Sequence, residues 1–396
     1  VARRDLGNGK RAVRVQLTGK RSTTDQISER TNADGIGSLV TVQSGDLRNS
    51  QEYTTHTAGM GQALVPLDFG IGRNEKAEVV RIRWPDLIPQ AELKIDPCKL
   101  LKVREDNRKP TSCPTLLVWD GEKFRFVSDI LGAASMGELG ADGSTRPPRP
   151  EESFKIEPGL LKPKDGTLLL KIAEPMDETM YLDRFELVAV DHPKGQFVYP
   201  DERFPTDTMP SQELLLFDRK IFPQKVTDHR GRDRARELRE WDGLQVDDFA
   251  HRRWLGFAEE HYLEFDIGDA LKGFGKDDRL YLCLAGWTDY AFPESIFAAA
   301  QADVKMLMPT LEVPQADGSW KPFLEVSIPA GLPRMMTREV SGIPTGRFRI
   351  RTNLPVYWDQ VFLAARLKAE PSTASVPLAN ATLTHRGFMK EIPGKG

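Results

Sequence analysis

Short segments in which apolar and polar residues alternate recur along almost the whole chain, and they restrict its fold more than any other feature. Alternation with a period of two places every second side chain on the same face, as in a strand with one buried face. Most of these segments are bounded by Gly, Pro, Asp or Asn. Short strands at this density predict an all-β fold made of β-sandwiches or jelly rolls. The segments are residues 11–17, 38–44, 77–84, 91–95, 115–129, 167–174, 181–193, 261–267, 279–287, 323–329, 347–353 and 360–367.

Asp-Gly pairs mark two tight turns between neighbouring strands. One pair lies at residues 120–121 between two arms of alternating pattern, and residues 317–318 repeat the arrangement. Glycine supplies the positive φ that such hairpin turns require. Helical patterns are scarce. Residues 293–306 begin with proline and favour a helix, whereas residues 233–243 are so charged that they predict a solvated surface turn.

A glycine-spaced segment at residues 69–72 raises the question of nucleotide binding. A phosphate-binding loop needs its glycines to open a helix, because the N–H groups of the first helical turn face the anion. Here a strand pattern follows, at residues 77–84. The glycines therefore predict a corner between strands, where they serve a positive φ or a close backbone approach. We expect the strand to end at Trp84, because Pro85 cannot donate a hydrogen bond to the sheet.

Length and charge exclude several classes of protein. A chain of 396 residues is too long for one ordinary core and suggests two or three domains. A net charge of −3 argues against sequence-independent binding to nucleic acid, which requires an excess of Lys and Arg. No apolar run approaches about 18 residues, so no membrane span is expected. Composition shifts, including a charged connector near residues 201–250, place the domains at residues 1–106, 107–250 and 251–396.

Three cysteines do not form a disulfide framework. Cys283 lies in an apolar segment and is expected to be buried. Cys98 and Cys113 flank a short basic segment and could pair in an oxidising compartment. Whether they pair stays open.

Three motifs in fixed order resemble the ASPIC/UnbV domain family. They are "VRVQLTGKRS", "DGIGSLVTVQSGD" and "DFGIGRNEKAEVVRIRWPD", spread over about a hundred residues. The chain departs from the usual family pattern at residues 21–23, where Ser-Asn is typical, and an insertion follows at residues 24–32. Ser38 replaces an alanine, and Asp86 replaces a glycine-containing turn.

The remainder is similar to the region that follows this domain in large bacterial proteins of the same family. The matching stretches include "CPTLLVWDGEKFRFVSDILG" and "RFRIRTNLPVYWDQVFLA". The resemblance implies an extracytoplasmic or secreted multidomain protein, with an FG-GAP/VCBS-type β-propeller normally joined at the N-terminal side. It implies an ASPIC/UnbV-like β-sandwich followed by one or two jelly-roll-like β-sandwiches. The family offers no catalytic residues that could be carried over.

Aromatic residues beside Asp, Asn or Gln occur at two strand ends, at residues 285–295 and 352–360. A sandwich that binds sugar presents an aromatic face together with hydrogen-bonding partners. In the alternative interpretation, Trp358 fills the core of the sandwich and Asp359 caps a turn. The candidate ligand-binding residues are Trp287, Asp289, Tyr290, Arg351, Asn353, Trp358 and Asp359.

The evidence for catalysis or metal binding is weaker. An acidic turn contains Glu174, Asp177, Glu178 and Asp183. Its clustered oxygens suit calcium better than glycosidase chemistry, although no D-x-D-x-D-G spacing supports a calcium site. Asp191 and His192 before a proline favour a turn over a metal or proton-transfer site.

Catalytic motifs give no further lead. The chain has no G-x-S-x-G or H-E-x-x-H motif. His251 and His261 lie near charged residues and are expected at the surface or at the rim of a sheet.

These observations predict a non-catalytic binding or scaffolding module, with carbohydrate as the first candidate ligand and another protein as the second. An accessory factor or tailoring enzyme of secondary metabolism is the alternative that the UnbV resemblance implies. A purely structural role as a spacer also stays open.

Overall fold

The computed structural model describes residues 8–19, 31–55, 61–106, 113–130, 144, 149, 151–176, 179–205, 208–275 and 277–384. The chain divides into two compact units. Unit 1 comprises Val1–Ser112, Ala173–Leu182 and Ala379–Gly396, and unit 2 comprises Cys113–Ile172 and Asp183–Leu378. The domain limits expected from the sequence were 106 and 250. The chain passes from unit 1 to unit 2 after residue 112, and residue 250 lies inside unit 2.

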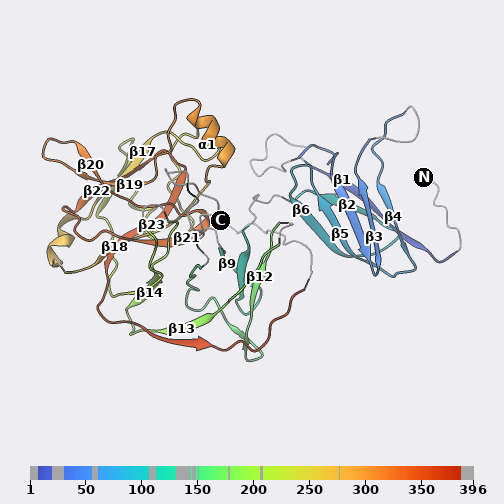
Figure 1. Cartoon of the computed structure of the whole chain (residues 1–396), viewed down its shortest axis with the longest axis horizontal. Helices are drawn as coiled ribbons and strands as arrows, with labels where there is room; N and C mark the ends of the chain where they lie inside the picture. Colours follow the sequence, from blue (N-terminus) through green and yellow to red (C-terminus); the bar gives the residue numbers. More distant parts are fainter. Residues whose placement is uncertain are drawn as a thin grey trace. The chain divides into compact units, whose positions relative to one another are not determined.

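Unit 1 is a sandwich of two sheets (Figure 1). One sheet has the strand order β4-β1-β7 and the other β3-β2-β5-β6. Both sheets contribute to a single apolar core, because Val13 on β1 and Val40 on β2 belong to the same buried cluster. The strands are β1 (Arg11–Thr18), β2 (Leu39–Ser44), β3 (Leu47–Glu52), β4 (Leu67–Gly72), β5 (Ala77–Arg83), β6 (Pro89–Ile95) and β7 (Leu100–Arg104).

The glycine-spaced segment belongs to β4 and is not followed by a helix. Gly70 lies inside β4 and Gly72 ends it with φ at +62°, after which the chain turns into β5. The prediction that a strand, and not a helix, follows these glycines is thus confirmed. The predicted corner is only partly correct, because Gly70 pairs with Ala12 of β1 as an ordinary strand residue. β5 ends at Arg83, immediately before the Trp-Pro pair.

Side chains of β3 cover part of the edge strand β4. All six residues of β3 are exposed. The amide nitrogen of Asn49 donates to the carbonyl oxygen of Gly70 at 3.2 Å, and that of Gln51 donates to the carbonyl oxygen of Asp68 at 2.8 Å. Uncovered edge strands expose backbone groups that other chains can pair with. The two amides therefore occupy acceptors that an intruding strand would use.

Unit 2 contains the remaining elements, and almost all are strands. They are β8 (Thr115–Trp119), β9 (Phe124–Asp129), β10 (Pro163–Lys164), β11 (Thr167–Leu168), β12 (Leu170–Ala173), β13 (Leu187–Asp191), β14 (Phe197–Pro200), β15 (Leu214–Phe217), β16 (Lys225–Asp228), β17 (His261–Asp266), the 3-10 helix η1 (Gly268–Gly273), β18 (Leu280–Thr288), α1 (Pro293–Ala300), β19 (Thr310–Pro314), β20 (Trp320–Glu325), β21 (Gly331–Glu339), β22 (Arg347–Thr352), β23 (Val356–Ala365) and β24 (Ser372–Val376).

The main sandwich of unit 2 packs a five-stranded sheet, β16-β17-β22-β19-β20, against a three-stranded sheet, β21-β18-β23. Leu263 and Phe348 from the first sheet share a buried cluster with Leu282 and Leu363 from the second. β16 precedes residue 250 and β17 follows it, and these two strands pair directly. The pairings within both sheets are antiparallel, so the predicted all-β sandwich architecture is confirmed.

The three-stranded sheet is buried on both faces. Tyr281, Cys283 and Phe362 point away from the main core and pack against Leu215 and Phe217 of the β14–β15 hairpin. Burial on both faces explains why β18 and β23 read as nearly continuous apolar runs instead of alternating ones. The hairpin forms a third layer in unit 2 (Figure 1).

The local predictions for turns and helices mostly hold. Gly121 and Gly318 adopt positive φ values of +104° and +84° in the β8–β9 and β19–β20 hairpins. The predicted helix is α1, which ends at residue 300. Residues 235–239 form turns, but Leu238 is buried in the main core, so this segment packs against the sandwich.

Two remaining sequence predictions concern cysteines and membranes. Cys283 is buried, as expected, and burial raises the pKa of its thiol. Cys98 is an exposed free thiol, so it forms no disulfide with Cys113 here. No helix among the described residues is long and apolar enough to cross a membrane.

Candidate functional site

A β-bulge interrupts the pairing of β18 and β23 close to the candidate residues. The register shifts between Ala285 and Gly286 and leaves Asp359 as the extra residue of β23. The Asp359 carboxylate accepts hydrogen bonds from the backbone N–H groups of Asp242, at 3.1 Å, and Gly243, at 3.0 Å. Burial raises the pKa of Asp359. The bulge therefore turns this carboxylate onto a neighbouring turn of the chain and away from solvent.

Five rings gather at the end of β18 and β23 nearest the bulge. Trp287 and Tyr357 are cross-strand partners whose rings stack with centroids 4.2 Å apart and planes inclined by 11°. Phe249 lies 5.2 Å from the Tyr357 ring and stacks on His261 at 4.5 Å. The Tyr357 hydroxyl and Nε2 of His251 share a hydrogen bond of 3.0 Å. We call Trp287, Tyr357, Phe249, His251 and His261 the aromatic cluster.

Polar groups adjoin the Trp287–Tyr357 pair. Nε1 of Trp287 donates a hydrogen bond to Oε1 of Gln245. Burial raises the pKa of Tyr357 to about 12, and the negative charges of Asp289 and Asp247 add to the effect. Trp287 and Tyr357 are half-buried, whereas Asp247 and His251 are exposed. The pair thus combines aromatic surface with hydrogen-bonding groups at its margin.

A network of ion pairs fixes the loop that carries Phe249 and His251. The Asp248 carboxylate contacts three arginines, among them Arg230 at 2.7 Å. These contacts, the hydrogen bond from Arg232 first, lower the pKa of Asp248. Asp228 is 3% exposed; burial alone would raise its pKa, but hydrogen bonds from Arg232 and Arg234 lower it overall.

Glu259 links this network to the aromatic cluster. Its carboxylate accepts the Ala250 N–H at 2.9 Å and pairs with Arg230, and these interactions lower its pKa. The Glu259 carbonyl oxygen accepts a hydrogen bond from Nδ1 of His261 at 2.9 Å. Glu259 contacts the loop through its side chain and His261 through its backbone. It therefore connects the ring of His261 to the ion-pair network around Arg230.

His261 is buried, contrary to the surface or rim position expected from the sequence, whereas His251 is exposed as predicted. Burial lowers the pKa of His261 to about 4, and the nearby His229 and Arg230 act in the same direction. His261 is the first residue of β17, and the ring of Phe249 covers its imidazole. Sequence periodicity did not reveal this, since the enclosing loop has no regular pattern.

This burial predicts a specific dependence of stability on pH. The imidazole of His261 has a pKa of about 6.5 in the unfolded state and about 4 in the folded state. Between these two pH values the unfolded state therefore binds a proton at His261 that the folded state does not bind. The free energy of unfolding therefore carries no cost from His261 above pH 6.5. As the pH drops from 6.5 towards 4, this group lowers the free energy of unfolding by about 3 kcal/mol. Urea unfolding at pH 7, 6, 5 and 4 should show that His261→Asn removes this loss.

The exposed His192 offers a matched control for the pH experiment. His192→Asn should leave the pH dependence of the wild-type protein unchanged. The comparison is made between variants at each pH, because Asp228, Asp248 and Glu259 also titrate, at lower pH. Identical pH profiles for His261→Asn and wild type would contradict the assignment.

Three other residues predicted to bind ligand make contacts within the protein itself. Trp358 is 3% exposed and belongs to the main core, and Asn353 fixes the backbone of Lys305 and Leu307. Arg351 pairs with Glu260 at 2.7 Å and Glu312 at 2.9 Å. The placements of Trp358 and Asp359 match the alternative in which Trp358 fills the core and Asp359 caps a turn.

Tyr290 lies outside the aromatic cluster. Its ring is 38% exposed and contacts Phe292 at 5.7 Å. Of the seven candidates, the structure thus brings Trp287 and Asp289 together near Tyr357. Sequence reasoning missed Gln245 and Phe249, which no strand or motif pattern marked.

The acidic turn and the Asp-His pair do not form a metal site among the described residues. Asp177 and Glu178 lie outside the described residues, so calcium at this turn stays a prediction. Within the described part of the chain, no group of three or more His, Cys, Asp or Glu side chains is arranged to hold a metal ion. Asp191 ends β13, and His192 follows it at the surface.

Comparison with known proteins identifies one domain. Residues 28–110 match the family model described as ASPIC and UnbV. The match begins after β1 and covers β2 to β7, which make up most of the sandwich of unit 1. It confirms the resemblance drawn from the glycine-containing motifs. No curated protein and no solved structure matches the chain.

Proposed function

We propose that the chain, which contains an ASPIC and UnbV domain and a second unit of packed β-sheets, is a non-catalytic binding module and that unit 2 binds carbohydrate through the aromatic cluster. The module would act outside the cytoplasm as part of a multidomain protein. Rigid sandwiches suit this role, since they hold exposed loops and strand ends in fixed positions.

The stacked pair of Trp287 and Tyr357 is the observation that carries the proposal. Sugar rings present a face of C–H groups that packs on aromatic surface, while their hydroxyls need nearby acceptors and donors. The pair is half-buried, and Gln245, Asp247 and Asp289 supply the polar groups around it. The stack, the bulge and the ion-pair network hold the pair in place before any ligand arrives, which lowers the entropic cost of binding.

We expect Trp287→Ala to weaken binding to polysaccharide by at least about tenfold, since aromatic residues at the centre of an interface contribute 1.4 kcal/mol or more. The wild-type protein is screened on an array of neutral and acidic polysaccharides. The affinity of each variant for the best ligand is then measured by calorimetry.

Trp320→Ala provides the matched control. Trp320 is also half-buried, but it lies on the edge strand β20 between Arg347 and Arg349. This variant should bind like wild type. The carbohydrate proposal fails if no polysaccharide on the array binds, or if a folded Trp287→Ala variant retains full affinity.

A further inference from the structure

A pocket lies in unit 2, between the turn of the β8–β9 hairpin and residues 159–162. It has a volume of about 650 Å³. This size falls within the range of about 300–1,000 Å³ that is usual for pockets that bind small molecules. None of the candidate residues described above lines it. The lining residues are Asp120, Gly121, Glu122, Arg125, Phe126, Gly159, Leu160 and Lys162.

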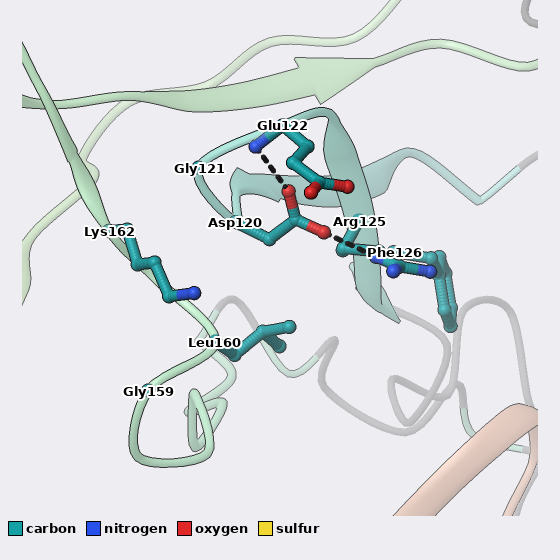
Figure 2. A pocket seen from close by; sticks show the side chains of 8 residues that line it. All are labelled: Asp120, Gly121, Glu122, Arg125, Phe126, Gly159, Leu160 and Lys162. Carbon is teal, nitrogen blue, oxygen red and sulfur yellow. Dashed lines mark hydrogen bonds and ion pairs between the residues drawn. The ribbon is translucent and has the colours of Figure 1, made fainter.

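Hydrogen bonds fix the hairpin side of this pocket. The Asp120 carboxylate accepts hydrogen bonds from the backbone N–H of Glu122, at 2.8 Å, and from Nε of Arg125, at 2.5 Å (Figure 2). It also accepts one from the backbone N–H of Lys123, at 2.8 Å. These bonds hold the pKa of Asp120 well below its usual range. Asp120 therefore stays ionised, and the N–H groups and the Arg125 guanidinium compensate its charge. Its role is to hold the turn in shape.

With Asp120 and Arg125 paired, the charges that remain in the pocket are those of the Lys162 ammonium and the Glu122 carboxylate. The backbone N–H of Lys162 donates to the carbonyl oxygen of Trp119 at 2.8 Å, which anchors residues 159–162 to the hairpin. Figure 2 shows its side chain reaching towards the hairpin turn, with Leu160 beside it. Among the described residues, no ion pair or hydrogen bond engages the Lys162 ammonium, and none engages the Glu122 carboxylate.

Arg125 adds donors and Phe126 adds apolar surface. Arg125 donates its Nε–H to Asp120, so this hydrogen bond does not use the two terminal nitrogens of its guanidinium. Phe126 is 41% exposed. Two further lysines contact rings of the same hairpin: the Lys164 ammonium lies 4.8 Å from the centroid of Trp119, and that of Lys171 lies 3.7 Å from the centroid of Phe124. The pocket lining itself carries two acidic and two basic side chains, Asp120 and Glu122 beside Arg125 and Lys162.

We propose that this pocket binds a carboxylate-bearing sugar, such as a uronate residue of an acidic polysaccharide. Lys162 and the terminal nitrogens of Arg125 pair with the sugar carboxylate. Glu122 accepts a hydroxyl hydrogen bond, and Leu160 and Phe126 contact the C–H face of the ring. The neighbouring lysines attract adjacent acidic residues of the same polymer. The site is separate from the aromatic cluster and does not depend on binding there.

The test measures binding of oligogalacturonate to the full chain and to three variants. Lys162→Gln should weaken binding about tenfold to a hundredfold, which is the effect of losing one charge-assisted hydrogen bond. Lys162→Arg should restore most of the affinity. Lys321→Gln, at an exposed lysine on β20 outside the pocket, should bind like wild type. Thermal unfolding should be unchanged, because Lys162 is exposed.

Further measurements separate this proposal from the proposed function. Trp287→Ala should keep its affinity for oligogalacturonate, and a neutral dextran oligosaccharide should not compete. The inference is overturned if wild type does not bind oligogalacturonate, if Lys162→Gln and Lys321→Gln bind equally, or if dextran competes as well as the acidic ligand. A heparin fragment that binds well while oligogalacturonate does not would also overturn it, since the anion would then be sulfate.

Discussion

Asp129→Ala is expected to lower the free energy of unfolding of unit 2 by about 3–5 kcal/mol, because it removes one partner of a buried ion pair. Asp129, on β9, is 1% exposed and pairs with Arg334 of β21. Arg334 is itself buried, and its other charged neighbour, Glu152, lies 3.7 Å away. Without Asp129, the guanidinium keeps its desolvation cost but loses its closest counter-charge.

Several ion pairs surround this contact and make the region sensitive. Arg149 pairs with Glu202 at 2.5 Å, and Arg203 pairs with Asp201 at 2.8 Å, all with buried side chains. Buried pairs contribute little net stability when intact, but breaking them is costly. The Asp129–Arg334 pair therefore acts chiefly to define how β9 and β21 pack.

Urea unfolding followed by tryptophan fluorescence measures this effect. Asp269→Ala is the matched control, since Asp269 pairs with Lys272 at 2.8 Å and its side chain is 81% exposed. An exposed pair contributes about 0–1 kcal/mol. Equal, small losses in both variants would show that the Asp129–Arg334 contact does not form in solution.

Trp358→Ala is expected to destabilise unit 2 by about 3–5 kcal/mol, the usual cost of removing a buried aromatic side chain. Trp358 lies in the main core, and its carbonyl oxygen accepts the N–H of Val246 at 2.9 Å. Trp287→Ala should cost less, because the indole of Trp287 is only half-buried. The two substitutions should therefore have different effects: Trp358→Ala lowers stability, and Trp287→Ala weakens binding.

The same unfolding assay, combined with the polysaccharide array, tests this separation. The Trp287→Ala variant is the comparison for Trp358→Ala, because Trp287 lies on β18, the strand that pairs with β23. A Trp358→Ala variant with wild-type stability and reduced sugar binding would contradict the core placement. It would also restore Trp358 as a ligand-contacting residue.

Much of the fold could be predicted from the sequence because alternation reports burial directly. In β1, Val13, Val15 and Leu17 are buried and the intervening residues are not, as a half-buried strand requires. The hairpin turns followed from their Asp-Gly pairs. The strand that follows the glycines of β4 was also predicted, because residues 77–84 alternate between apolar and polar side chains.

The candidate site was harder to predict, and the bulge in β23 explains why. One extra residue reverses which side chains face the core beyond it. Trp358 and Val361 both face the main core although they are three residues apart, because Asp359 is inserted between them. Nothing in the local sequence shows this shift, so Trp287 and Trp358 looked equivalent as ligand residues.

Residues from irregular loops were missed for a related reason. Gln245 and Phe249 reach Trp287 and Tyr357 from a segment without periodic pattern. The pocket beside the β8–β9 hairpin likewise forms only when residues 159–162 pack against the turn. Such contacts depend on tertiary structure and leave no signal in spacing or composition.

The environment of the Trp287 indole gives the most direct test of the binding proposal. In a protein labelled with ¹⁵N at tryptophan, the Nε1–H resonances of Trp287 and Trp358 are assigned from the two alanine variants. They are then followed during titration with a series of neutral and acidic oligosaccharides. We predict that at least one oligosaccharide shifts the Trp287 resonance in a saturable way while the buried Trp358 resonance stays in place. A Trp287 resonance that no oligosaccharide moves would contradict the account.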